Sequence, residues 1–256
     1  MKVYLGVDLG SSGTKAVLLD SEGRWLGAGR VPTGADYGEA LESARRAARR
    51  EARVELLRRT WSRGEAQILP ILKSFREAIA REMGWRFRED VLRRLAEAVG
   101  GRARAGKEAL GEEALGEGWR GMEAGGIPAY GLRGILERIR EAAVRMAPRW
   151  GVPAAELVGR VEEAARAAER ALYRADLEDL LEQAAERVRV RLRGKAREGW
   201  ERAWRQVAGL PLDEVRRGVT GYGRHVNAWA KAEVCSELVC HARGARWLFP
   251  GTSTVL

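Results

Sequence analysis

Cysteine is scarce in this sequence, and its scarcity limits how the fold can be stabilised. Only two cysteines, Cys235 and Cys240, occur among the 256 residues. Disulfide frameworks belong to short secreted chains with a much denser cysteine pattern, so disulfides are not what holds this protein together. We therefore expect the two thiols to be reduced, bound to a metal or redox-active.

Long apolar runs and targeting signals are missing as well. No segment offers the run of about eighteen apolar residues that crosses a bilayer. The first residues do not combine a charged stretch, an apolar stretch and a cleavage site, which is the pattern of a secretory signal. The sequence thus predicts a cytoplasmic protein that does not enter a membrane.

Negative charge is in short supply. The chain has 46 Lys and Arg against 36 Asp and Glu, a formal net charge of +10. Clustered cations bind nucleic acid by releasing counterions from its phosphates, but cations interspersed with Glu and Asp on solvated helix faces give the same count. Nucleic-acid binding is therefore an alternative and not the favoured interpretation. The cations are most concentrated in residues 44–53 (ARRAARREAR), which would be the surface for RNA or an acidic protein.

Strand-forming segments occur near both ends of the chain, and helix-forming residues fill the middle. Residues Lys2–Leu9, Lys15–Asp20 and Arg24–Val31 are predicted to be three strands of a meander. The middle is rich in Ala, Arg, Glu and Leu, with apolar positions at three- and four-residue steps. From Leu210 a helical turn, a short strand, a glycine turn, a helix from Ala228 to Trp247 and a final strand are expected.

Neither flank alone has enough apolar surface to fold, so we expect one α/β domain interrupted by a large all-α insertion. The insertion contains a glycine-rich connector and breaks at its prolines, and no catalytic constellation is visible in it. Its tryptophans are expected to be core or interface anchors: Trp61, Trp85, Trp119, Trp150, Trp200 and Trp204. The predicted segments are 1–35, the insertion 36–208 with its connector near 100–126, and 209–256.

The segment GVDLGSSGTK (6–15) places an acidic residue at a strand end, followed by glycines, hydroxyls and a lysine. Glycines let the backbone approach a phosphate, hydroxyls and amides donate to its oxygens, and lysine adds charge. The acidic residue would hold Mg²⁺ through water. This is not a Walker loop, because the lysine leads into a strand; an ordinary Gly- and Ser-rich hairpin is the alternative. The predicted nucleotide-binding residues are Asp8, Gly10, Ser11, Ser12, Gly13, Thr14 and Lys15.

The longer stretch VDLGSSGTKAVLLDSEG (7–23) resembles the phosphate-1 motif of the superfamily that contains sugar kinases, actin and heat-shock-protein ATPases. In that superfamily the corresponding Asp, hydroxyls and Lys contact the nucleotide phosphates and magnesium. The resemblance implies a ribonuclease-H-like ATPase lobe that binds ATP and Mg²⁺.

Residues 219–256 carry a second signature, TGYGR followed by SELVCHARGA and FP. It resembles the ATP-dependent activators of 2-hydroxyacyl-CoA dehydratases, which are related to the ATPase subunits of benzoyl-CoA reductase. The resemblance implies a homodimer that bridges a [4Fe–4S] cluster and passes an electron to a dehydratase or reductase partner. Cys240 matches the first cluster ligand of that family, whereas Cys235 matches none.

The resemblance covers the two ends of the chain only. Members of that family continue with a second phosphate motif, an adenosine site and a second cluster cysteine, so the resemblance implies an incomplete ATPase lobe. A truncated or split gene whose missing lobe is another chain, a degenerate relative and an artificial sequence would each account for this.

Three other interpretations stay open. A zinc site could combine the two cysteines with His225 and His241, although CxxxxCH lacks the paired CxxC spacing. A sugar-kinase relative is favoured by the hairpin alone, but no catalytic Asp is recognisable. A non-enzymatic basic helical module would bind nucleic acid or a protein partner.

Arg224 could reach an acidic partner, shape the nucleotide cleft or cap a helix.

Overall fold

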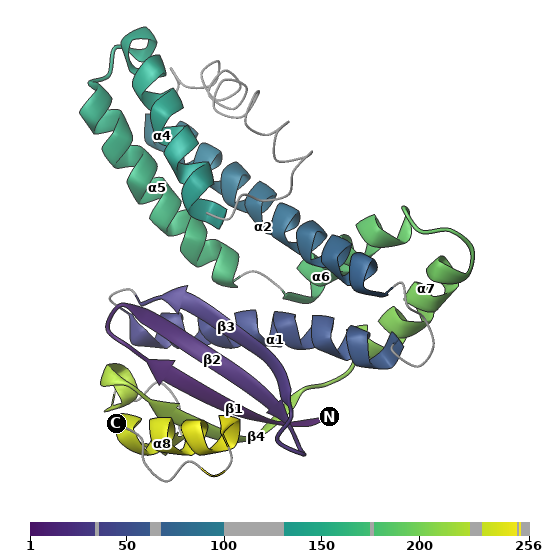
Figure 1. Cartoon of the computed structure of the whole chain (residues 1–256). Helices are drawn as coiled ribbons and strands as arrows, with labels where there is room; N and C mark the ends of the chain where they lie inside the picture. The colour runs from purple at the N-terminus through teal and green to yellow at the C-terminus, as the bar shows by residue number, and fades with distance from the viewer. Residues whose placement is uncertain are drawn as a thin grey trace. The chain divides into compact units, whose positions relative to one another are not determined.

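The chain forms two compact units. The computed structural model describes residues 1–33, 36–61, 68–99, 131–174, 177–225, 232–249 and 251. One unit, the sheet unit, combines Met1–Leu69 with Arg193–Leu256, and the other, the helical unit, is Pro70–Leu192 (Figure 1). The predicted connector near 100–126 and the final strand lie outside the described residues.

The sheet unit is built on five strands in the order β3-β2-β1-β4-β5. The first three form an antiparallel meander, and β4 and β5 run parallel to β1. The predicted opening meander is confirmed, and its strand ends agree to within two residues. The strands are β1 (Lys2–Leu9), β2 (Gly13–Asp20), β3 (Trp25–Pro32), β4 (Asp213–Thr220) and β5 (Glu233–Val234).

Helix α1 (Tyr37–Trp61) covers one face of this sheet (Figure 1). Side chains alternate along a strand, and every second residue of β1, from Val3 to Leu9, is buried. A Cβ built on Gly29 would lie 2.2 Å from the Ala44 carbonyl oxygen, so β3 and the helix backbone are in direct contact only because the strand has glycine there. The residues between the buried ones, including Asp8 and Lys15, therefore lie on the opposite face, which we call the open face.

Arginines of α1 bind inside the sheet unit. Arg45 and Arg49 both donate to the buried carboxylate of Glu214 on β4, at 2.7 and 3.1 Å. Arg53 is itself buried and donates to the carbonyl oxygens of Val207 and Leu210, at 2.7 and 2.6 Å. These three belong to the basic stretch 44–53, so part of its charge serves the fold.

Helix α7 (Gly194–Ala208) also belongs to the sheet unit, through a tryptophan cluster with α1. The rings of Trp61 and Trp200 are 6.3 Å apart between centroids, and Trp200 stacks on Trp204 at 6.2 Å. Trp200 is fully buried, as the core interpretation predicts for it. The compact units thus divide the chain at residues 69 and 192, whereas the sequence-based division is at 35 and 208.

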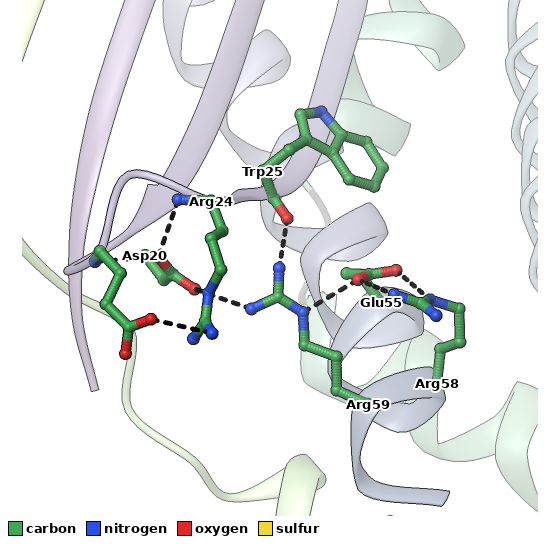
Figure 2. A network of polar contacts seen from close by, with 7 residues as sticks. Asp20, Arg24, Trp25, Glu55, Arg58 and Arg59 are labelled. Carbon is green, nitrogen blue, oxygen red and sulfur yellow. Dashed lines mark hydrogen bonds and ion pairs between the residues drawn. The ribbon is translucent and has the colours of Figure 1, made fainter. Parts of the chain in front are cut away.

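The turn between β2 and β3 is held to α1 by an ion-pair network (Figure 2). The buried carboxylate of Asp20 accepts hydrogen bonds from the side chains of Arg24 and Arg59 and from the backbone N–H groups of Arg24 and Glu22. Burial by itself would raise the pKa of Asp20, but these hydrogen bonds outweigh it and hold the pKa far below its usual range. Arg59 also bridges to Glu55 and to the Trp25 carbonyl oxygen.

The helical unit consists of α2 (Ile68–Val99), whose first two residues lie in the sheet unit, with α4 (Gly131–Trp150), α5 (Ala154–Arg174) and α6 (Leu177–Arg189). Its core confirms the stripes read from the sequence, with Phe87, Val91, Leu95, Ile139 and Met146 buried in one cluster. The buried carboxylate of Glu82 on α2 pairs with Arg86 and with Arg187 of α6. None of the helices in the described ranges is long and apolar enough to cross a membrane.

The helix expected from Ala228 to Trp247 starts later than predicted. Glu233–Val234 is strand β5, and helix α8 occupies Glu237–Leu248. The late start has a local cause, because the Ser236 hydroxyl accepts a hydrogen bond from the Val239 N–H at 3.3 Å and so caps the helix. The part of the prediction that covers residues 228–231 lies outside the described residues.

Candidate functional site

The hairpin of β1 and β2 places an acidic and a basic side chain side by side on the open face. Asp8 and Lys15 are opposed in the antiparallel ladder, and Lys15 Nζ donates to Asp8 Oδ2 at 2.8 Å. The side chains are 33% and 55% exposed, so both stay within reach of a ligand from solvent. An exposed pair of this kind contributes little to stability, at most about 1 kcal/mol.

The turn of the hairpin is closed tightly by its glycines. A Cβ built on Gly10 would lie 2.8 Å from the carbonyl oxygen of Gly13, closer than real Cβ contacts allow. Ser11 and Ser12 at the tip are exposed, and the Ser12 carbonyl accepts a hydrogen bond from the Thr33 N–H at 3.2 Å. The tip therefore presents two hydroxyls on a backbone that the close Gly10–Gly13 approach and the hydrogen bond from Thr33 hold in place.

Thr14 differs from the other predicted ligands in where its side chain lies. It is fully buried on the α1 side of the sheet, and its hydroxyl lies 2.8 Å from that of Thr33. The structure thus brings Asp8 and Lys15 together beside the exposed serine tip, and it places the Thr14 side chain on the opposite face. The nucleotide-binding role of these residues stays a prediction.

The end of β4 adds two residues that the sequence-based list lacks. Thr220 is the in-register neighbour of Asp8 in the parallel ladder, so the two side chains share the open face. The Thr220 hydroxyl oxygen is buried and has no hydrogen-bond partner within the described part of the chain. A buried hydroxyl without a partner is costly, and such a group next to a carboxylate suggests a missing polar ligand.

Gly221 follows with a φ of +92°, a conformation that favours glycine. A Cβ at this position would lie 2.6 Å from Asp8 Oδ1 and 2.6 Å from the Leu9 carbonyl oxygen. The backbone of the second turn is therefore packed directly against the carboxylate of the first. The sequence signal was the glycine directly after a strand-ending threonine, within the TGYGR signature.

Arg224 holds this second turn in place. Its backbone N–H and its Nη1 both donate to the Gly221 carbonyl oxygen, at 3.2 and 3.0 Å. It lies in the short 3-10 helix η2 (Tyr222–His225), where Gly223 packs against the ring of Tyr37 at the start of α1. These two hydrogen bonds fix the turn beside Asp8.

The two cysteines lie at the beginning of α8. Cys240 is partly exposed in the first turn, and its N–H donates to the Ser236 carbonyl oxygen at 3.1 Å. Cys235 precedes the cap, is also partly exposed, and donates its N–H to the Val219 carbonyl oxygen at 2.9 Å. None of the described α8 side chains is buried, and Leu238 and Trp247 are strongly exposed apolar residues.

The cysteine supply does not fit an iron–sulfur cluster held by one chain. A [4Fe–4S] cluster is bound by four cysteine thiolates, and this chain has two cysteines in all. Among the described residues there is also no group of three or more His, Cys, Asp and Glu that could hold a metal ion, which leaves the zinc alternative without support there. A cluster would need thiolates in addition to these two.

The residues at the two turns do fit magnesium and a phosphate chain. Carboxylate and hydroxyl oxygens are the donors that Mg²⁺ takes from proteins, and Asp8 with the unpartnered Thr220 hydroxyl offers one of each. Lys15 and the two exposed serines are suited to phosphate oxygens. A side chain at Gly10 would collide with the Gly13 carbonyl oxygen, and one at Gly221 would collide with Asp8 and Leu9.

Comparison with protein families gives one match. The family described as the BadF/BadG/BcrA/BcrD ATPase family matches residues 5–256. No curated protein and no solved structure matches the chain. The matched range includes both turns of the site and α8 with its cysteines.

Proposed function

Because the chain belongs to the BadF/BadG/BcrA/BcrD ATPase family, we propose that it binds ATP with Mg²⁺ at the turn after β1 and the turn after β4. The observation that carries this proposal is the Asp8 carboxylate, which lies between the Lys15 ammonium and the unpartnered hydroxyl of Thr220. If the Asp8–Lys15 pair were purely structural, the buried Thr220 hydroxyl beside it would have no reason to lack a hydrogen-bond partner.

Each residue of the site has a definite task in this proposal. Asp8 would accept hydrogen bonds from water on a bound magnesium ion, and the Thr220 hydroxyl would donate or accept one more. Lys15 and the hydroxyls of Ser11 and Ser12 donate to phosphate oxygens. Arg224 keeps the Gly221 turn against Asp8 and so maintains the geometry of the carboxylate. The magnesium ion, when bound, neutralises charge on the phosphates.

Calorimetric titration of the purified chain with ATP, in the presence of Mg²⁺ and again in EDTA, tests the proposal. The wild-type chain should bind ATP only with the metal, and Asp8→Asn should weaken binding about 10- to 100-fold, as loss of a group that orients metal ligands does. Asp213→Asn is the matched control, because Asp213 is an exposed carboxylate at the other end of the sheet. Equal affinities of the two variants would reject the proposed site.

We further propose that the chain serves as the ATP-dependent, electron-transferring component of a 2-hydroxyacyl-CoA dehydratase or benzoyl-CoA reductase system. The support for this finer function is the SELVCHARGA signature together with the partly exposed Cys240 near exposed apolar residues of α8. In this proposal Cys240 supplies one thiolate to a cluster that a second chain completes.

Anaerobic purification with iron and sulfide analysis tests this finer function. We expect a brown protein, loss of iron in Cys240→Ala, and retention of iron in Cys235→Ala. A colourless chain with no iron would reject the electron-transfer role and leave the ATP site to be judged by its own titration. RNA binding with steep salt dependence by such a chain would favour the basic-module alternative.

A further inference from the structure

Arg30 on β3 lies beside the candidate phosphate site, and neither the motif nor the resemblance draws attention to it. We propose that Arg30 is a second phosphate-binding cation, which contacts the terminal phosphates of a bound nucleoside triphosphate together with Lys15. This inference rests on the proposed ATP site and extends it to a third strand.

The strand register places Arg30 in one row with the site. Asp8 opposes Lys15 across β1 and β2, and Lys15 opposes Arg30 across β2 and β3. Opposed residues in a sheet project from the same face, with Cβ atoms about 4.5 to 5.5 Å apart. With Thr220 as the neighbour of Asp8, four polar side chains cross the open face at the end that carries the glycine turn.

The side chain of Arg30 extends toward that turn. A Cβ built on Gly13 would lie 3.8 Å from Arg30 Nε, an ordinary contact distance, so the Arg30 side chain lies next to Gly13. Gly13 directly precedes the Thr14–Lys15 pair of the phosphate motif. The Arg30 side chain therefore reaches the hairpin that carries the phosphate motif.

The local charges favour an anion at Arg30. Lys15 is paired with Asp8 at 2.8 Å, whereas Arg30 is exposed and makes no hydrogen bond or ion pair with any residue that the structure describes. The other arginine near this hairpin, Arg24, is occupied by Asp20 and Glu22 at the opposite end. Guanidinium groups bind phosphate through two parallel N–H donors, which makes a free arginine at a glycine turn well suited to a polyphosphate.

Calorimetric titration with ATP, ADP and AMP in the presence of Mg²⁺ tests this inference on the full chain. Arg30→Gln should weaken ATP binding about tenfold, as expected for one lost charge-assisted contact. AMP affinity should change less than about twofold, because AMP lacks the terminal phosphates. Arg30→Lys should recover part of the ATP affinity, since it keeps the charge and loses the planar fork.

Arg216→Gln is the matched control. Arg216 is also an exposed arginine of the same open face, on β4, but it pairs with Glu233 and lies toward the far end of the strand. The control should leave ATP affinity within about twofold, and both arginine variants should unfold at the wild-type denaturant midpoint, because exposed substitutions change stability little.

The outcomes separate this inference from the proposed function. A wild-type chain that binds ATP as tightly as Arg30→Gln overturns the role of Arg30 and leaves the ATP site intact. An equal loss of ATP and AMP affinity in Arg30→Gln also overturns it, because the contact would not be with the terminal phosphates. A wild-type chain that binds none of the three nucleotides overturns both proposals.

Discussion

Strand β2 has an aspartate–cation pair near each of its ends, and the two pairs differ in how completely they are satisfied. Asp20 is 1% exposed and accepts hydrogen bonds from two arginines and two backbone N–H groups (Figure 2). Asp8 is one-third exposed, has Lys15 as its partner, and lies beside the unpartnered Thr220 hydroxyl.

This difference distinguishes a structural carboxylate from one that is available for a ligand. A carboxylate whose hydrogen-bonding capacity is filled by the protein stabilises the fold and has no oxygen lone pair left for a metal-bound water. A carboxylate with a single exposed partner adds little stability and keeps oxygen lone pairs free to bind a ligand. Substitutions made in matched pairs at the two ends of β2 test this difference.

The largest effect is expected from Asp20→Ala. Loss of the Asp20 carboxylate leaves Arg59, which is three-quarters buried, without its charge partner in the β2–β3 turn. We therefore expect the free energy of unfolding to fall by about 3 kcal/mol. Asp8→Ala should cost no more than about 1 kcal/mol, because that pair is exposed. Urea unfolding of both variants measures the difference, and equal costs would contradict the distinction.

The second largest difference is expected between alanine substitutions in the glycine turns beside the two aspartates. Gly221→Ala forces a Cβ to within 2.6 Å of Asp8 Oδ1 at a φ of +92°, which we expect to cost about 3 kcal/mol or less and to abolish measurable ATP binding. Gly23→Ala in the Asp20 turn has a φ of +76° but no atom within 4 Å of its Cβ. That control should lose only about 1 kcal/mol, from its backbone strain alone, and keep its ATP affinity. Unfolding and titration of both variants provide the comparison, and parallel losses of ATP affinity would show that Gly221 has no special relation to the site.

Acid sensitivity should come from the Asp20 end. The folded pKa of Asp20 lies far below its unfolded value of about 3.9, so its stabilising contribution is complete above that value and is lost as pH falls through the folded pKa. Unfolding free energies measured between about pH 5 and 2 should therefore fall less steeply in Asp20→Asn than in the wild type. A residual slope is expected from Glu55: burial opposes ionisation there, but hydrogen bonds from Arg58 and Arg59 outweigh it and lower the pKa. Identical slopes would show that Asp20 is not the main acid-sensitive group.

The smallest effects are expected from two threonine-to-valine changes. Thr220→Val removes a hydroxyl without a described partner, so the stability of the ligand-free chain should stay unchanged or rise by up to about 1 kcal/mol. Thr14→Val breaks the 2.8 Å contact with Thr33 and should cost about 1 kcal/mol. Only Thr220→Val is expected to weaken Mg²⁺–ATP binding. A stability loss in Thr220→Val as large as that in Thr14→Val would show that its hydroxyl already has a partner.

Local patterns in the sequence were sufficient for most of the secondary structure. The alternation along β1 and the turn residues of the hairpins predict the meander, and the apolar steps predict the buried stripe of Phe87, Val91 and Leu95. The start of α8 departs from the prediction because the Ser236 cap begins the helix at Glu237, although helix-forming residues precede it. The Gly-hydroxyl hairpin and the TGYGR and SELVCHARGA signatures were sufficient to identify the family.

The partners of the charged residues could not be predicted in this way. The stretch 44–53 looks like a solvated basic surface in the sequence, yet Arg45 and Arg49 bind the buried Glu214 and Arg53 binds carbonyl groups after α7. Thr14 belongs to the motif but turns its hydroxyl into the interior. Charge and hydroxyl counts do not indicate which side of an element a neighbour will cover.

Neighbouring residues along the chain were enough to predict the β1–β3 meander, the buried helix stripes and the family, because periodicity, turn chemistry and short motifs act between residues that are close along the chain. The three-dimensional arrangement was needed to show that Thr220 and Gly221 lie beside Asp8, that Arg30 shares a face with Lys15, and that Asp20 is enclosed. These relations depend on the parallel pairing of β1 with β4, on the register of β3 and on the packing of α1. Such long-range pairing is set by the packing of the whole sheet unit and is not encoded at any one position.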